Sequence, residues 1–170
     1  HSQATGGNDT ASGFYTCATG GGSTASGYKS KSTGSVSSAF GHHSCSTASY
    51  ATAVGSYAKA TAQYSTAVGY LSCADGNYSV AMGYNSKACR TGGGAYATYA
   101  SAFGSGPNGA RANNHYTTAI GYDALMSEIG WMGLGVYDSG DNVCTNGGFY
   151  AVGAGTFNTS DCRLKCNILT

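Results

Sequence analysis

Small and large side chains alternate along the first half of the chain in a pattern that repeats every 14 residues. The marker is Ala-x-Gly, which occurs six times in register, first at Ala11-Ser12-Gly13 and last at Ala81-Met82-Gly83. Counted from this repeat glycine, positions −2, +3 and +5 hold only Ala, Ser or Thr. These positions lie at alternate places in two short runs, as expected for strands with one buried face. The sequence predicts an all-β solenoid with two short strands per coil and an interior of small side chains.

Large apolar and aromatic side chains occupy other fixed positions. They stand at −5 (Tyr50, Tyr64, Tyr78), at −1 (Phe40, Val54, Val68, Met82) and at +1 (Phe14, Tyr28, Tyr70, Tyr84). With coils about 4.8 Å apart, we expect these side chains to form ladders along one outer face. Monomers rarely expose so large an apolar patch, and an interior of small residues buries little apolar area. The pattern therefore indicates an obligate homo-oligomer.

Tyr50, Tyr64 and Tyr78 are the candidate binding residues. In one interpretation their rings pack at the interface between chains. In the other, the rings stack against sugar rings of a host glycan. Both interpretations remain open at this point.

Position +4 alternates between cysteine and lysine in all six copies: Cys17, Lys31, Cys45, Lys59, Cys73 and Lys87. Equivalent cysteines are two coils apart, roughly 10 Å, which exceeds the ~7 Å Cα separation that a disulfide can span. We therefore expect no disulfide among these three cysteines and a solvated face along this rank.

Composition and charge exclude several classes of function. The net charge is +1 and there are only 8 Lys and Arg residues, too few for a basic patch that binds nucleic acid. No apolar run approaches the roughly 18 residues that a membrane span requires. Paired carboxylates in a plausible site are lacking, so we expect neither an enzyme active site nor a cofactor. The chain begins at His1 without a signal-peptide pattern, and we expect it to be an excerpt or a processed product.

Metal binding is not expected either. The seven cysteines include no C-x-x-C pair, which argues against a zinc ribbon. His42 and His43 are neighbours, but adjacent residues in a strand point to opposite faces and cannot share one ion.

The strict period ends after Gly83, because the next Ala-x-Gly marks follow at Ala102-Phe103-Gly104 and Ala119-Ile120-Gly121. We therefore divide the chain into a regular roll over residues 1–91, irregular coils and loops over 92–159, and a distinct terminal segment over 160–170. A short helical turn is expected near residues 124–128.

The units Tyr50-Ala51-Thr52-Ala53-Val54-Gly55 and Tyr78-Ser79-Val80-Ala81-Met82-Gly83 resemble the head repeat of YadA-type trimeric adhesins. This resemblance covers about half of the chain. It implies a left-handed parallel β-roll, assembly as a homotrimer, and surfaces that bind host cells.

The terminal segment Ser160-Asp161-Cys162-Arg163-Leu164-Lys165-Cys166-Asn167-Ile168 is similar to the opening of the intramolecular chaperone domain of phage tail spikes, the S74 autopeptidase family. The resemblance implies that Ser160 is the nucleophile and Lys165 the base of a self-cleaving dyad. Residues 160–170 would be the beginning of that domain. Since only the beginning is present, we expect no proteolysis from these residues alone.

Together these features predict a trimeric attachment fibre or spike shaft of a virus or phage. Its partners would be a host glycan or protein receptor and other virion components, and its location the virion surface. The alternative is the head of a bacterial trimeric autotransporter adhesin at the bacterial surface. A spike depolymerase ranks third, for want of carboxylate pairs.

Overall fold

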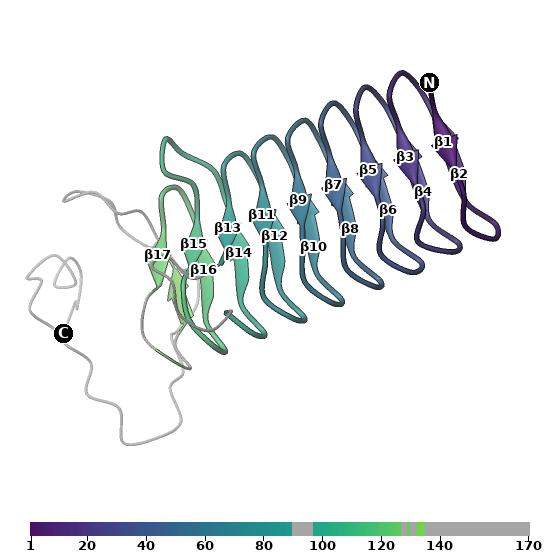
Figure 1. Cartoon of the computed structure of the whole chain (residues 1–170). Helices are drawn as coiled ribbons and strands as arrows, with labels where there is room; N and C mark the ends of the chain where they lie inside the picture. Colours follow the sequence, from purple (N-terminus) through teal and green to yellow (C-terminus); the bar gives the residue numbers. More distant parts are fainter. Residues whose placement is uncertain (90–96, 127–128, 130–131, 135–170) are drawn as a thin grey trace, which may run out of the picture.

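The computed structural model describes residues 1–89, 97–126, 129 and 132–134. Within these residues, all regular secondary structure is β-strand, arranged in two parallel sheets of nine strands each. Figure 1 shows the coils stacked side by side, from β1 and β2 at the N-terminal end to β17 at the other. The predicted parallel β-solenoid is confirmed. Left-handed winding and three-fold assembly remain predictions.

Each coil contributes one strand to each sheet. The odd sheet consists of β1 (Gln3–Ala4), β3 (Cys17–Ala18), β5 (Lys31–Ser32), β7 (Cys45–Ser46), β9 (Lys59–Ala60), β11 (Cys73–Ala74), β13 (Lys87–Ala88), β15 (Arg111–Ala112) and β17 (Leu125–Met126). The even sheet consists of β2 (Thr10–Ser12), β4 (Thr24–Ser26), β6 (Ser38–Phe40), β8 (Thr52–Val54), β10 (Thr66–Val68), β12 (Val80–Met82), β14 (Ser101–Phe103), β16 (Thr118–Ile120) and β18 (Met132–Leu134).

Equivalent positions lie directly above one another in the stack. Ala53, Ala67 and Ala81 pair in successive even strands, and so do their neighbours on either side. Pairing continues past residue 91, because β12 pairs with β14 and β13 with β15. The strands on either side of these longer intervals stay in register. The expected segments 1–91 and 92–159 therefore share one pair of sheets as far as Leu134.

One detail differs from the expectations. The helical turn predicted near residues 124–128 is absent from the described part of that segment, where Leu125–Met126 form strand β17. This strand pairs in parallel with β15, so the periodic stacking overrides the local helical preference.

The interior is built from small side chains, as predicted. Positions −2, +3 and +5 are fully or almost fully buried in the second to sixth coils, and position −4, which the sequence analysis did not single out, is buried there as well. Buried serines satisfy their hydroxyls locally: Ser65 donates to the Ala62 carbonyl at 2.5 Å and Ser72 to the Gly69 carbonyl at 3.0 Å. Alanine and serine therefore substitute for each other in this interior without leaving most hydroxyls unpaired.

The repeat glycine is required by both backbone conformation and space. Gly55 has φ of 130°, in the region that favours glycine, and a Cβ placed there would overlap the carbonyl group of Gly69 in the next coil. The other repeat glycines stack in the same way, so the glycine rank lets successive turns approach closely.

No helix in the described residues is both long and apolar enough to cross a membrane.

Candidate functional site

The tyrosines at position −5 lie in the turn that precedes each even strand. Tyr50, Tyr64 and Tyr78 all have positive φ, between 57° and 59°. In this conformation each backbone N–H points along the stack, and Tyr64 donates to the Ser49 carbonyl of the preceding coil at 3.1 Å. The backbone hydrogen-bond ladder thus continues through the turn, which offsets part of the ~1–2 kcal/mol cost of a left-handed residue.

The rings of these tyrosines form one continuous stack. Tyr50 and Tyr64 have ring centroids 5.0 Å apart, and Tyr64 and Tyr78 have centroids 4.9 Å apart, with nearly parallel planes. Tyr99 and Tyr116 extend the stack at 4.9 and 5.1 Å. We call Tyr50, Tyr64, Tyr78, Tyr99 and Tyr116 the tyrosine ladder. The sequence analysis missed its last two members because insertions place them outside the 14-residue spacing.

The tyrosine ladder is exposed along its whole length, with relative exposure of the residue from 41% at Tyr64 to 63% at Tyr116. Stacked rings at such a spacing gain favourable contacts with each other, yet each leaves one edge free. The ladder therefore presents a flat aromatic strip about five coils long.

The expectation of a single aromatic face is wrong. The position +1 side chains lie in the turn that follows each even strand, at the opposite edge of the coil from position −5. That second edge carries its own chain of ring contacts, which we call the mixed aromatic edge: Phe14, Tyr15, Tyr28, His42, His43, Tyr57, Tyr70 and Tyr84. The error arose because these positions belong to two different turns and not to one strand.

His42 and His43 are part of this edge and lie in a turn. The argument that they must point to opposite faces of a strand is therefore wrong, since their rings are in contact with centroids 4.5 Å apart. Desolvation, followed by the nearby His42 and Lys29, lowers the pKa of His43 below its ordinary value. Each imidazole also contacts neighbouring tyrosines, with His43 stacked on Tyr57 at 5.1 Å. These contacts indicate packing along the edge.

The outer faces of the two sheets differ in chemistry. The even sheet exposes or half-exposes a rank of apolar side chains at position −1: Phe40, Val54, Val68, Met82, Phe103 and Ile120. The odd sheet carries the alternating cysteines and lysines, with Lys31 and Lys59 exposed and the cysteines half-buried. The predicted solvated face at position +4 is confirmed at the exposed Lys31 and Lys59, whereas the cysteines of the same rank are half-buried. Cys17, Cys45 and Cys73 are free thiols, as expected.

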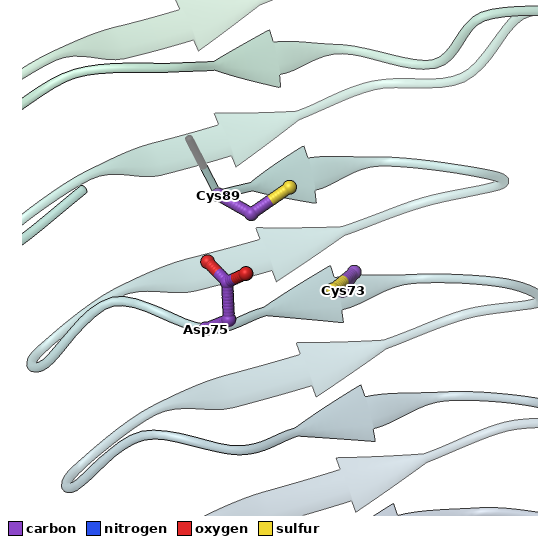
Figure 2. A group of neighbouring side chains, drawn as sticks. All are labelled: Cys73, Asp75 and Cys89. Carbon is purple, nitrogen blue, oxygen red and sulfur yellow. The ribbon is translucent and has the colours of Figure 1, made fainter. Parts of the chain in front are cut away.

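Next to that rank, the structure brings together three residues that the sequence analysis did not connect. Cys73 and Asp75 lie on one coil and Cys89 on the next (Figure 2). The sulfur atoms and a carboxylate oxygen all lie within 4.8 Å of one another, and Cys89 is buried.

The two thiols and the carboxyl influence each other strongly. A hydrogen bond with Cys89 lowers the pKa of Cys73, while the same contact and then burial raise the pKa of Cys89 well above its ordinary value. Burial raises the pKa of Asp75. The cluster therefore holds a thiolate more readily at Cys73 than at Cys89.

A sequence signal for this cluster did exist. Position +6 changes from threonine in the first four coils to Asp75 and Cys89 in the next two. The sequence analysis compared only equivalent positions of successive coils. It therefore missed the diagonal contact between Cys73, at +4 of one coil, and Cys89, at +6 of the next. The candidate autocleavage residues Ser160 and Lys165 lie outside the described residues.

Comparison with known families and structures shows what the repeats are similar to. Residues 18–44, 46–72 and 74–88 match the family model described as the YadA head domain repeat. Among solved structures, the chain is similar to the collagen-binding domain of the Yersinia adhesin YadA, with 25% sequence identity and a TM-score of 0.51. That similarity covers 90% of this chain and 69% of the other. No curated protein matches the sequence.

The resemblance to YadA-type heads is thus supported twice, once by sequence repeats and once by fold. These comparisons give no support to a phage tail-spike chaperone domain, and they favour the bacterial adhesin alternative over the viral fibre.

Proposed function

We propose that this chain is the head of a surface-exposed trimeric adhesin, displayed at the bacterial cell surface, that attaches to a fibrous protein of the host matrix. One observation carries the proposal: the residues that match YadA head repeats lie within the regular roll and include Tyr50, Tyr64 and Tyr78 of its exposed tyrosine ladder. The similar Yersinia structure is a collagen-binding domain, so collagen is the first partner to test.

The shape and chemistry of the roll suit an extended partner. Nine stacked strands per sheet give the described part a length of roughly 38 Å at about 4.8 Å per strand. Flat edges of aromatic rings and a nearly neutral net charge favour contact with a rod-like protein surface through packing and hydrogen bonds, without strong electrostatic steering.

The experiment is a binding assay with the purified full chain on immobilised triple-helical collagen, with heat-denatured collagen and albumin as comparison surfaces. Saturable binding that is at least ten-fold stronger on collagen than on albumin is the expected result. A folded protein that adheres neither to collagen nor to cultured animal cells would rule out the adhesin head.

A second candidate is the trimeric viral fibre with a removable chaperone, favoured by the motif from Ser160 to Ile168. In this proposal Lys165 accepts the hydroxyl proton of Ser160 as the oxygen attacks a backbone carbonyl carbon at the motif. The peptide C–N bond then breaks, Lys165 returns the proton to the leaving amine, and water hydrolyses the resulting ester, so that a C-terminal assembly domain is released. The test is a gene product extended beyond Thr170. Ser160→Ala and Lys165→Ala should each abolish the cleaved band, whereas Ser101→Ala should leave it, and cleavage in all three would reject the dyad.

A further inference from the structure

We propose that Cys73, Asp75 and Cys89 form a binding site for a thiophilic divalent cation of the zinc class. Two sulfurs and one carboxylate oxygen within 4.8 Å of one another match the donor set and spacing that zinc requires. With Zn–S bonds of about 2.3 Å, a tetrahedral ion holds two sulfurs roughly 3.8 Å apart.

The backbone geometry favours a shared ion over a disulfide. Cys73 pairs directly with Lys87, so Cys89 is two residues further along the neighbouring coil. Such diagonal neighbours have Cα atoms roughly 7–8 Å apart, at or beyond the ~7 Å limit for a disulfide. A metal ion replaces the single S–S bond of a disulfide with two metal–sulfur bonds. It can therefore link the two cysteines over this longer distance without movement of the backbone.

A buried oxygen atom supports the assignment independently. Asp75 Oδ1 is buried and has no hydrogen-bond partner in the described part of the chain. Buried oxygens without partners are unfavourable. A bound cation removes this penalty at Asp75.

Charge balance also fits the site. Two thiolates and a carboxylate around a divalent ion leave one negative charge, and binding releases the two thiol protons to solvent. Lys59 and Lys87 both pair with Cys73 in the adjacent rungs and supply positive charge there. Thiolate donors favour zinc over calcium or magnesium.

The proposed cation site lies where the regular spacing of the coils ends, which gives it a structural role at this one pair of coils. Cys89 lies in the interval between Gly83 and Gly104, the first that departs from the 14-residue spacing. A cation shared by Cys73 and Cys89 ties the coil that enters this interruption to the regular coil before it. The cation therefore acts as a structural clamp.

The test is metal analysis of the full chain purified under reducing conditions without chelator, followed by titration with cobalt(II) as a spectroscopic probe. We expect about one zinc per chain and, with cobalt, thiolate-to-metal charge-transfer bands together with tetrahedral ligand-field bands. Cys89→Ser should weaken cobalt binding at least ten-fold. Cys45→Ser is the matched control, because Cys45 holds the same +4 position but faces Thr61 diagonally, and it should bind cobalt as the parent does.

Asp75→Asn provides a second variant that is nearly isosteric and keeps the fold, as checked by circular dichroism. It should also weaken cobalt binding at least ten-fold. Absence of charge-transfer bands in the folded, reduced parent would overturn the proposal. So would bands that persist unchanged in both Cys89→Ser and Asp75→Asn, or a Cys73–Cys89 disulfide found by peptide mapping in place of the metal.

Discussion

At the scale of single residues, two kinds of turn position shape this roll. The repeat glycines combine positive φ with close backbone contact between coils. Positions −5 and +2 also have positive φ, yet they accept tyrosine, histidine, lysine, leucine and valine as well as asparagine. Both backbone and space distinguish the two: φ is 49–63° for the non-glycine residues at −5 and +2 but 122–148° at the repeat glycines, where a Cβ would also meet the next coil.

We predict that Gly55→Ala lowers the free energy of unfolding by roughly 2–5 kcal/mol, because it adds left-handed strain and overpacking against Gly69. The measurement is urea unfolding followed by circular dichroism. Gly7→Ala is the control, since nothing lies within 4 Å of a Cβ there, and its change should stay within about 0.5 kcal/mol. Equal effects of both changes would contradict the close-approach argument.

Asp9 gives a second prediction at this scale. It accepts hydrogen bonds from the Ser23 N–H at 2.7 Å, the Ser23 hydroxyl at 2.9 Å and the Gly6 N–H at 2.7 Å, and the backbone bond from Ser23 does most to lower its pKa below 3.8. A lowered pKa in the folded state means that its stabilising effect is present above the unfolded value and is lost as pH falls through the folded value. We expect the first coil to open at pH below about 3.8 before the central coils do.

Amide hydrogen exchange along an acid titration would measure this opening. Asp9→Asn should make the first coil exchange faster at neutral pH and remove the acid dependence there. Uniform acid sensitivity of all coils would show that Asp9 has no special role.

At the scale of elements, the coil is the unit of structure. Each coil pairs with its two neighbours through short strands, and backbone hydrogen bonds continue through both turns. Since contacts are only between adjacent coils, the roll is a stack of nearest-neighbour interactions. A whole coil can therefore be removed if the register of side chains is kept.

We predict that deletion of residues 56–69 leaves a folded, shorter roll, because Gly55 is then followed by Tyr70 in the correct phase. The deletion brings Cys45 and Cys73 into adjacent rungs, about 4.8 Å apart and within disulfide range. Mild oxidation should link them in the deletion variant and not in the parent, as detected by peptide mapping. Deletion of residues 56–62 is the control; it removes β9 alone and should abolish cooperative unfolding.

At the scale of the whole molecule, exposed apolar surface is the main feature to be explained. The tyrosine ladder, the mixed aromatic edge and the apolar rank of the even sheet are all exposed or half-exposed on the single chain. An alanine and serine interior buries little apolar surface in compensation. Association of chains through one of these surfaces would stabilise the roll, and we expect a homotrimer.

Our prediction for assembly concerns the tyrosine ladder. Tyr50→Asn, Tyr64→Asn and Tyr78→Asn combined should convert the trimer to monomer in light scattering, because asparagine keeps the left-handed turn, as Asn8 does at the same position. Tyr57→Asn is the matched control: Tyr57 is 39% exposed against 41% for Tyr64, lies on the other edge, and has Asn85 as a natural equivalent. A triple variant that stays trimeric yet loses collagen binding would instead assign the ladder to ligand contact.

The repeat pattern was sufficient to predict the fold and most of the interior. A 14-residue period with small side chains at −2, +3 and +5 is enough to specify stacked strands, because strand alternation and side-chain volume are local properties. It also predicted the solvated face at +4 and singled out Tyr50, Tyr64 and Tyr78 as candidate binding residues. The function of these tyrosines is a proposal.

The tertiary structure alone decided which side chains from different coils meet. Turn conformation separates positions −5 and +1 onto opposite edges, and strand pairing carries the sheets and the tyrosine ladder past the insertions. The same stacking brings Cys89 diagonally next to Cys73 and Asp75. These contacts depend on the offset between neighbouring coils and on the direction of each side chain in the turns, which a one-dimensional period does not contain.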